Sequence, residues 1–167
     1  MPISFLPAVI VDAVTDITPE LLQNLGVRLL MLDFDNTIVP YTTDVPTEEV
    51  SHWLKAMGES GISLCVVSNS KNNRVKIFCE KYGLDCITHA RKPFPKGIRQ
   101  CLEKYGLGPK ECALVGDQIF TDTLGANGCG VRPILVRAIH NHNFWLKARH
   151  VLEMPFIYAA KNRRIQK

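Results

Sequence analysis

Short apolar runs recur along the chain, separated by segments of mixed polarity. A run of this kind, bounded by turn residues, is typical of a strand that is buried on both faces of a sheet. The sequence therefore predicts strands at residues 27–32, 62–67, 86–88, 112–115 and 132–136.

The segments between these runs carry apolar residues at the spacing i, i+3, i+4, i+7, which gives a helix one buried face. This spacing predicts helices at residues 50–57, 75–82 and 98–105, the first of them capped by Thr47. Thr18 is placed to cap a further helical piece before the first strand. Strands that alternate with single helices are joined by right-handed crossovers. The expected fold class is α/β, a three-layer αβα sandwich around a doubly wound parallel sheet.

The length and the cysteines indicate an ordinary globular protein. With 167 residues, 46% of them hydrophobic, the chain can bury a core of its own. We expect a single domain over residues 1–167, with a catalytic core at about 27–136 and a basic C-terminal segment at 137–167. The six cysteines include no CxxC pair. They are expected to be buried, reduced thiols rather than a zinc site or a disulfide framework.

Positive charge is concentrated in residues 137–167. This segment has seven Lys and Arg residues against one acidic residue, Glu153, and carries +6, whereas the whole chain carries +4. An anionic membrane surface would attract such a segment, with the apolar residues 144–146 inserted beside it. A solvated helix with these residues packed on the domain is an equally good interpretation.

The N-terminus lacks the basic region of a signal peptide. Its apolar stretch at residues 3–11 is broken by Pro7 and is too short to cross a bilayer. We therefore expect a cytoplasmic protein without a transmembrane span, and one that can meet the inner membrane face peripherally. Phe5 and Ile10 in this stretch fit either a packed core or a membrane contact.

Polar residues directly follow the predicted strands. The carboxyl ends of parallel strands meet at one edge of a sheet, where ligands bind, so these residues are expected to lie close together. Each group alone has a plain structural explanation, since Ser-Asn is a common helix cap and Lys-Pro a turn. Their shared placement argues for a site. The first strand is followed by Asp33, Asp35 and Thr37, the second by Ser68 and Asn69, the third by Lys92, and the fourth by Asp117 and Asp122.

The carboxylates define the chemistry of this edge. Clustered carboxylates repel one another unless a hard dication neutralises them, and Mg²⁺ prefers oxygen ligands of this kind. Bound Mg²⁺ would also draw in a phosphate group, so that the Asp33 carboxylate can attack phosphorus despite its like charge. Asp35 is placed to protonate the leaving alkoxide and then to deprotonate the hydrolytic water. Ser68 and Lys92 would hold the phosphoryl oxygens.

In order and in residue type, the four motifs resemble those of the haloacid dehalogenase (HAD) superfamily of phosphatases, over about residues 27–136. The resemblance implies a HAD-like Rossmannoid core and a Mg²⁺ site. In this family Asp122 would correspond either to a direct metal ligand or to a group that fixes the coordination. The resemblance implies Asp33 as nucleophile, Asp35 as acid and base, Thr37, Ser68, Asn69 and Lys92 as phosphate contacts, and Asp33, Asp35, Asp117 and Asp122 as the metal site.

Lys96 is an alternative to Lys92 as the phosphate-binding lysine. Lys92 is favoured because it directly precedes Pro93, as in the Lys-Pro form of this motif. Lys96 falls at the start of the following predicted helix, where a solvated side chain is the simpler explanation.

The sequence leaves no room for the cap domain that many members of this superfamily insert after the first or second motif. Residues 38–46 are all that separate the first motif from the next helix, and residues 68–92 hold one helix and one short strand. The site should therefore be open to solvent. An open site favours a substrate whose bulk stays outside: a protein, a nucleic acid, a lipid at a membrane surface, or a cap from another subunit.

More of the chain resembles one subgroup of subclass III, the YqeG-like phosphatases related to phosphatidylglycerophosphatases. This resemblance implies a Mg²⁺-dependent phosphomonoester hydrolase that forms an aspartyl phosphate and converts phosphatidylglycerophosphate to phosphatidylglycerol. The alternatives are a HAD phosphatase of nucleic-acid ends, nucleotides or phosphoproteins, and a non-catalytic scaffold, against which the intact motifs argue. The segments that carry the resemblance are Phe5-Leu6-Pro7, Ile17-Thr18-Pro19-Glu20, Ala90-Arg91-Lys92-Pro93, and Gly116-Asp117-Gln118 with Thr121-Asp122.

Overall fold

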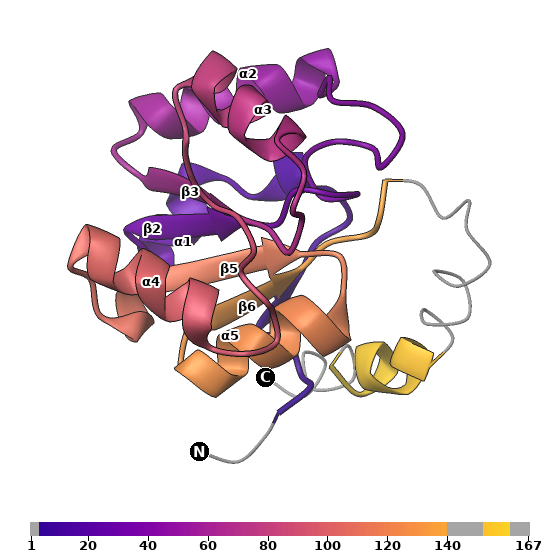
Figure 1. The fold of residues 1–167 in the computed structure, drawn as a ribbon. Helices are drawn as coiled ribbons and strands as arrows, with labels where there is room; N and C mark the ends of the chain where they lie inside the picture. Colours follow the sequence, from indigo (N-terminus) through magenta and orange to yellow (C-terminus); the bar gives the residue numbers. More distant parts are fainter. Residues whose placement is uncertain (1–3, 140–151, 161–167) are drawn as a thin grey trace.

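A parallel sheet of six strands forms the centre of the part of the chain that the structure, a computed structural model, describes: residues 4–139 and 152–160 (Figure 1). The strand order is β1-β6-β5-β2-β3-β4, so that β2 lies between β5 and β3. All neighbouring strands run parallel. The strands are β1 (Val9–Ile10), β2 (Leu29–Leu32), β3 (Ser63–Val67), β4 (Asp85–Ile87), β5 (Cys112–Gly116) and β6 (Arg132–Leu135).

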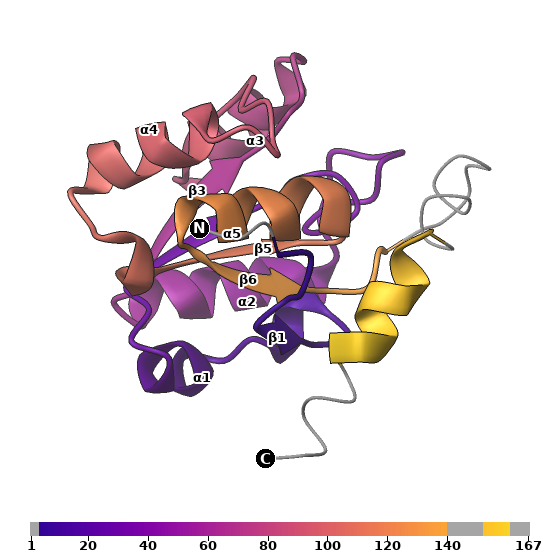
Figure 2. The same cartoon turned by 90° about the horizontal axis from the view of Figure 1, so that it is seen from below.

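Helices cover both faces of this sheet (Figures 1 and 2). Side chains of β2 alternate between the two layers: Leu30 and Leu32 join one hydrophobic core, and Leu29 and Met31 join the other. The predicted three-layer αβα sandwich is confirmed. The helices on the first face are α1 (Pro19–Asn24), α2 (Glu48–Glu59) and α3 (Arg74–Tyr82), and those on the second face are α4 (Lys96–Tyr105) and α5 (Leu124–Cys129).

The periodic segments fold as the sequence predicts. Each of the five predicted strands is present, with its ends within two residues of the expected bounds. The predicted helix caps are also present: Thr18 Oγ1 accepts from the N–H of Leu21 at 3.2 Å, and Thr47 Oγ1 accepts from the N–H of Val50 at 3.3 Å.

Of the strands and α-helices named above, two short ones are not predicted. β1 has only two residues, too few to show the alternation of apolar and polar positions that identifies a strand. It forms by pairing with β6: the N–H groups of Ala8 and Val11 donate to the carbonyls of Pro133 and Leu135. α5 has the sequence LGANGC, whose buried residues include only Gly125 and Ala126, so it carries no apolar stripe.

Neither insertion point of a cap domain carries one. Residues 33–47 connect β2 to α2, and α3 alone lies between β3 and β4, all within the described part of the chain. The expectation of a core without a cap domain is confirmed at these two connections.

The structure also bears on the cysteines and on the expected absence of a transmembrane helix. All six cysteines are free thiols, four of them buried. Within the described residues, no helix combines the length and the hydropathy needed to cross a bilayer. The apolar residues 144–146 and most of the basic segment lie outside the described residues.

Candidate active site

The carboxyl ends of β2, β3, β4 and β5 meet at one edge of the sheet, and the predicted residues lie on the loops that leave them (Figure 1). Asp33 directly follows β2, and its N–H donates to the carbonyl of Val115 in β5 at 2.9 Å. Ser68 directly follows β3, and Asp117 directly follows β5. Lys92 lies on the connection between β4 and α4. Four loops thus deliver functional groups to one place.

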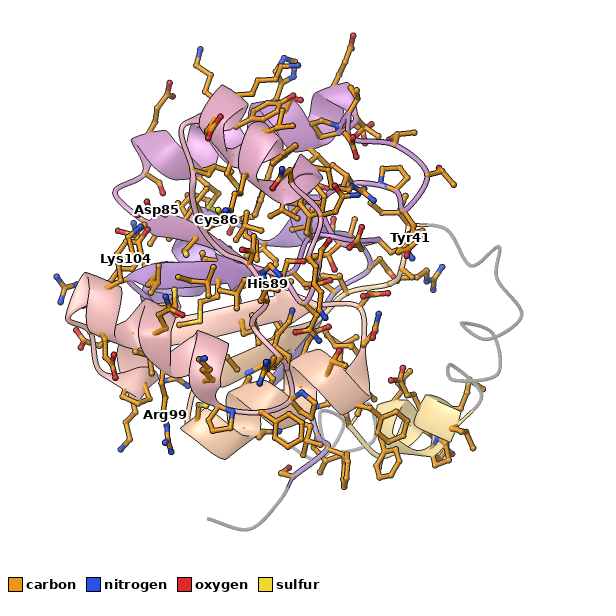
Figure 3. All side chains as sticks on the ribbon, in the orientation of Figure 1. Tyr41, Asp85, Cys86, His89, Arg99 and Lys104 are labelled. Atoms are coloured by element: carbon orange, nitrogen blue, oxygen red, sulfur yellow. The ribbon has the colours of Figure 1, made fainter. Side chains whose placement is uncertain are left out.

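A second polar cluster lies at the opposite end of the sheet. Asp85, at the start of β4, pairs with Lys104 and accepts a hydrogen bond from the Tyr105 hydroxyl at 2.7 Å. Figure 3 shows Asp85 and Lys104 together at this end, far from Tyr41, which lies on the loop after β2. This cluster ties α4 to the start of β4, so it belongs to the scaffold rather than to the site.

Three of the predicted carboxylates converge. Oxygens of Asp33, Asp117 and Asp122 lie within 4.8 Å of one another. The Asp35 carboxylate is not part of this group of three, and its Oδ1 lies 3.2 Å from the guanidinium of Arg74. The structure therefore brings together the carboxylates of three of the four predicted metal ligands.

The converging carboxylates have the properties of a cation site. Oδ1 of Asp117 is buried, and no group in the described part of the chain donates a hydrogen bond to it. Loss of contact with water, together with the charges of Asp33 and Asp122, raises the pKa of Asp117 well above its ordinary value. Burial also raises the pKa of Asp122 to about 6. Such carboxylates gain a counter-charge when a hard dication binds, so these residues fit one.

Lys92 is buried against the same carboxylates. Its ammonium lies 2.6 Å from Asp33 Oδ1 and 2.7 Å from Asp122 Oδ1, and the residue is only 4% exposed. Burial alone would lower the pKa of Lys92, but the charges of Asp122 and Asp33 outweigh it and raise the pKa. The ammonium therefore stays charged. Lys96 is the exposed first residue of α4, so it is Lys92 that the structure places beside Asp33.

Asn69 holds the backbone of Lys92. Its side-chain amide donates to the Lys92 carbonyl at 2.9 Å, and its carbonyl oxygen accepts from the Lys92 N–H at 2.6 Å. Both ends of the amide are thus engaged with the protein. Asn69, expected from the sequence to contact phosphate, fixes the loop that carries Lys92.

Thr37 and Ser68 complete the predicted set. The Thr37 hydroxyl donates to Asp33 Oδ2 at 3.4 Å, on the oxygen that Lys92 does not contact. Ser68 is 1% exposed, and its hydroxyl oxygen accepts from the N–H of Ser70 at 3.1 Å. The hydroxyl of Thr37 therefore orients the Asp33 carboxylate, while Ser68 closes a turn at the end of β3.

Gly116 leaves room for the Asp122 side chain. A Cβ at position 116 would lie 2.3 Å from the carboxylate carbon of Asp122, closer than atoms can approach. A π-helical turn follows over Ile119–Thr123, in which the N–H of Asp122 donates to the Gln118 carbonyl at 3.0 Å. The N–H of Gln118 donates in return to Asp122 Oδ2 at 3.2 Å. We call residues 117–123 the acidic turn.

Arg74, in the first turn of α3, belongs to no predicted motif. Its guanidinium lies 3.2 Å from Asp35 Oδ1 and 2.6 Å from Asp44 Oδ1. It also donates to the carbonyls of Tyr41 and Thr43 at 3.3 and 2.8 Å. Burial raises the pKa of Asp35, and the charge of Arg74 opposes that rise. The sequence holds one signal for Arg74 itself, though not for the residues it contacts. An arginine in the first turn of a helix lies at the positive end of the helix dipole, which is unfavourable unless an acidic side chain pairs with it.

Comparisons with known proteins agree with this fold. Residues 12–130 match the family described as haloacid dehalogenase-like hydrolase. The chain belongs to this family and is a hydrolase, as the resemblance of its motifs implies.

Relatives of the chain include phosphatases. The probable phosphatase YqeG of Bacillus subtilis is 38% identical over 132 residues, 79% of this chain and 77% of that protein. The mitochondrial phosphatidylglycerophosphatase GEP4 of Saccharomyces cerevisiae is 29% identical over 126 residues, 67% of this chain and 68% of that protein. Among solved structures, a cobalt-bound deoxy-D-mannose-octulosonate 8-phosphate phosphatase of Haemophilus influenzae superposes with a TM-score of 0.54 at 12% identity, over 77% of this chain and 89% of that one. The last likeness concerns the fold alone.

We expect Arg74→Met to lower the rate of phosphate release about tenfold and the free energy of unfolding by about 2 kcal/mol, because the loop after β2 loses charge-assisted hydrogen bonds to α3. Steady-state kinetics and urea unfolding measure the two effects. Lys76→Met, at an exposed position of the same helix, is the matched control and should change neither. Equal behaviour of the two variants would contradict the role of Arg74.

Proposed function

We propose that this protein is a Mg²⁺-dependent phosphatase that removes the terminal phosphate of phosphatidylglycerophosphate. The observation that carries the proposal is the contact of Asp33 with Lys92 at 2.6 Å, beside Asp117 and Asp122. Attack on a phosphate needs an ionised carboxylate next to fixed positive charge. Membership of the hydrolase family and similarity to a phosphatidylglycerophosphatase support the substrate class.

The first half-reaction forms an aspartyl phosphate. The Asp33 carboxylate attacks phosphorus, the bond from phosphorus to the glycerol oxygen breaks, and Asp35 donates a proton to the leaving alkoxide. Burial, which raises the pKa of Asp35, helps this residue to hold the proton that it donates. Lys92 and Ser68 contact the phosphoryl oxygens, where negative charge is held through the transition state.

The second half-reaction regenerates the enzyme. Water attacks phosphorus, its proton passes to Asp35, the bond to Asp33 breaks, and inorganic phosphate leaves. The carboxylates of Asp33 and Asp117 and the backbone carbonyl of Asp35 would hold Mg²⁺, which would supply the positive charge that lets an anionic phosphate approach a carboxylate. Asp122 pairs with Lys92 at 2.7 Å, so we assign it the role of fixing Lys92 and the acidic turn rather than that of a direct ligand.

We also propose that the protein meets this substrate at an anionic membrane surface. Large apolar side chains are exposed on loops and a helix beside the site edge, and groups of this kind insert at the interface of a bilayer. The basic residues of 137–167 would add attraction to anionic headgroups. These exposed side chains are Tyr41 and Val45 after β2, Phe94 after β4, and Leu152, Met154 and Tyr158 on the helix over residues 152–160.

The proposal is tested by phosphate release from phosphatidylglycerophosphate in mixed micelles with phosphatidylglycerol. A soluble phosphomonoester, a 5′-phosphorylated oligonucleotide and a phosphopeptide serve as competing substrates. We expect rapid turnover of the lipid and slow turnover of the others. Faster turnover of the oligonucleotide or the phosphopeptide would retain the chemistry and overturn the lipid assignment.

Removal of the metal is expected to abolish this activity. Excess EDTA should reduce phosphate release to the blank, and added Mg²⁺ should restore it, whereas EDTA already charged with Mg²⁺ should have no effect. Asp117→Asn should raise the Mg²⁺ concentration for half-maximal activity by about tenfold or more, because a ligand loses its charge. Full activity in EDTA would refute the metal requirement.

A further inference from the structure

The helix over residues 152–160 places a carboxylate against the acidic turn. Glu153 is 3% exposed, and its Oε1 accepts hydrogen bonds from the N–H of Ile119 at 2.9 Å and from the N–H of Phe120 at 3.3 Å. Figures 1 and 2 both show this helix, in yellow, beside the segment that leads into α5. The segment at the C-terminal end of the chain therefore contacts the active-site loop.

These two N–H groups belong to the first turn of the helical segment that begins at Ile119. Such groups have no partner within their own helix, and the positive end of the helix dipole favours an anion there. Glu153 supplies both a hydrogen-bond acceptor and a negative charge. Within the described residues, Glu153 thus holds the backbone between Asp117 and Asp122 from outside the turn.

Hydrogen bonds within the acidic turn couple the backbone at Ile119 and Phe120 to the Asp122 carboxylate. The N–H of Asp122 donates to the Gln118 carbonyl, and the N–H of Gln118 donates to Asp122 Oδ2, so Gln118 and Asp122 move together. Ile119 and Phe120 lie between them in the chain. A shift of their backbone would displace Asp122, and with it the partner of Lys92.

An aromatic cluster makes a second contact with the same helix. Phe156 packs against Phe5 at 5.0 Å and Phe120 at 6.3 Å between ring centroids, and Phe5 packs edge-on against Phe120 at 5.9 Å. The Asn127 amide donates to the carbonyls of Ser4 and Leu6 on either side of Phe5. Phe5 is a half-buried residue that packs within this cluster. Glu153 and Phe156 are thus two separable contacts of one helix.

We propose that Glu153 is a positioning residue for the metal site, which it acts on through the backbone of the acidic turn. The inference rests on the proposed function, because it takes Asp117 as a Mg²⁺ ligand. Glu153 is the one acidic residue among the mostly basic residues 137–167, and its burial against the turn explains why a carboxylate occurs there. The C-terminal helix is part of the assembly of the active site.

The test measures Mg²⁺ binding to the metal-free full-length protein by calorimetry, together with the melting temperature. Glu153→Asp keeps the charge but withdraws the oxygen by one methylene, and it should weaken Mg²⁺ binding about tenfold. Glu153→Gln keeps the acceptor at the same reach and should weaken it about threefold or less. Met154→Ala, at an exposed position of the same helix, is the matched control and should leave Mg²⁺ binding unchanged.

Phe156→Ala separates positioning from simple stability. It removes the aromatic contact and should lower the melting temperature while leaving the Mg²⁺ affinity within about twofold of the wild type. A lower melting temperature of Glu153→Asp with unchanged Mg²⁺ affinity would overturn the inference and leave the proposed function standing. A wild-type protein that binds no Mg²⁺ would overturn the metal assignment and the inference together.

Discussion

Asp33→Asn is expected to abolish phosphate release while the protein stays folded. The amide has nearly the shape of the carboxylate but is no nucleophile, so the rate should fall by about four orders of magnitude or more. Lys92 keeps Asp122 as a partner in this variant, at 2.7 Å in the present structure, so the buried ammonium is not left alone. Steady-state kinetics and circular dichroism of the same preparation measure the two properties.

The control for this variant is Asp12→Asn. Asp12 is a surface carboxylate that lies 3.4 Å from Arg137 and has an 86% exposed side chain. Loss of one exposed charge pair should change neither activity nor stability measurably. Substantial hydrolysis by Asp33→Asn, with mass spectrometry confirming the asparagine, would rule out the covalent mechanism.

Lys92→Met is expected to lose both activity and stability. Without the ammonium, two buried carboxylates, Asp33 and Asp122, lose the positive charge that pairs with both of them. Removing one side of a buried ion pair costs about 3 kcal/mol or more. Phosphate release should fall by about 10²- to 10³-fold, as for the loss of one donor to the transition state.

Lys96→Met is the matched control, since Lys96 is the exposed first residue of α4. Its free energy of unfolding should stay within about 0.5 kcal/mol of the wild type. Urea unfolding in EDTA and kinetics in Mg²⁺ compare the two variants directly. A larger loss of activity in Lys96→Met than in Lys92→Met would reverse the choice between the two lysines.

The convergence of Asp33 and Asp117 could be predicted from the sequence because it follows from two regular features. Apolar runs fix where strands end, and parallel strands end at one edge of a sheet. Residues that directly follow β2 and β5 must then lie side by side, since these two strands are neighbours. No knowledge of side-chain contacts is needed for that step.

The contacts of Arg74 and Glu153 could not be predicted in the same way. Arg74 meets Asp35 and Glu153 meets Ile119 through contacts between distant parts of the chain, and such contacts depend on how loops and a separate helix pack. Neither contact leaves a period or a motif in the local sequence. The hydrogen bonds between the Asn69 amide and the Lys92 backbone could not be predicted either. A Ser-Asn pair after a strand is also compatible with a helix cap or a phosphate contact.

The edge position of β1 also sets the order in which the sheet is completed during synthesis. Val9 pairs with Ile134, so among the strands of the described residues the first one made has the last one made as its partner. The pair β2 and β3 can form as soon as those strands leave the ribosome, since a chain emerges from its N-terminus. Pairing of β1 must wait for β6, with the loop-closure cost of a long-range contact. Completion of the N-terminal edge of the sheet is therefore a late event, whereas β2 and β3, which Asp33 and Ser68 directly follow, can pair much earlier in synthesis.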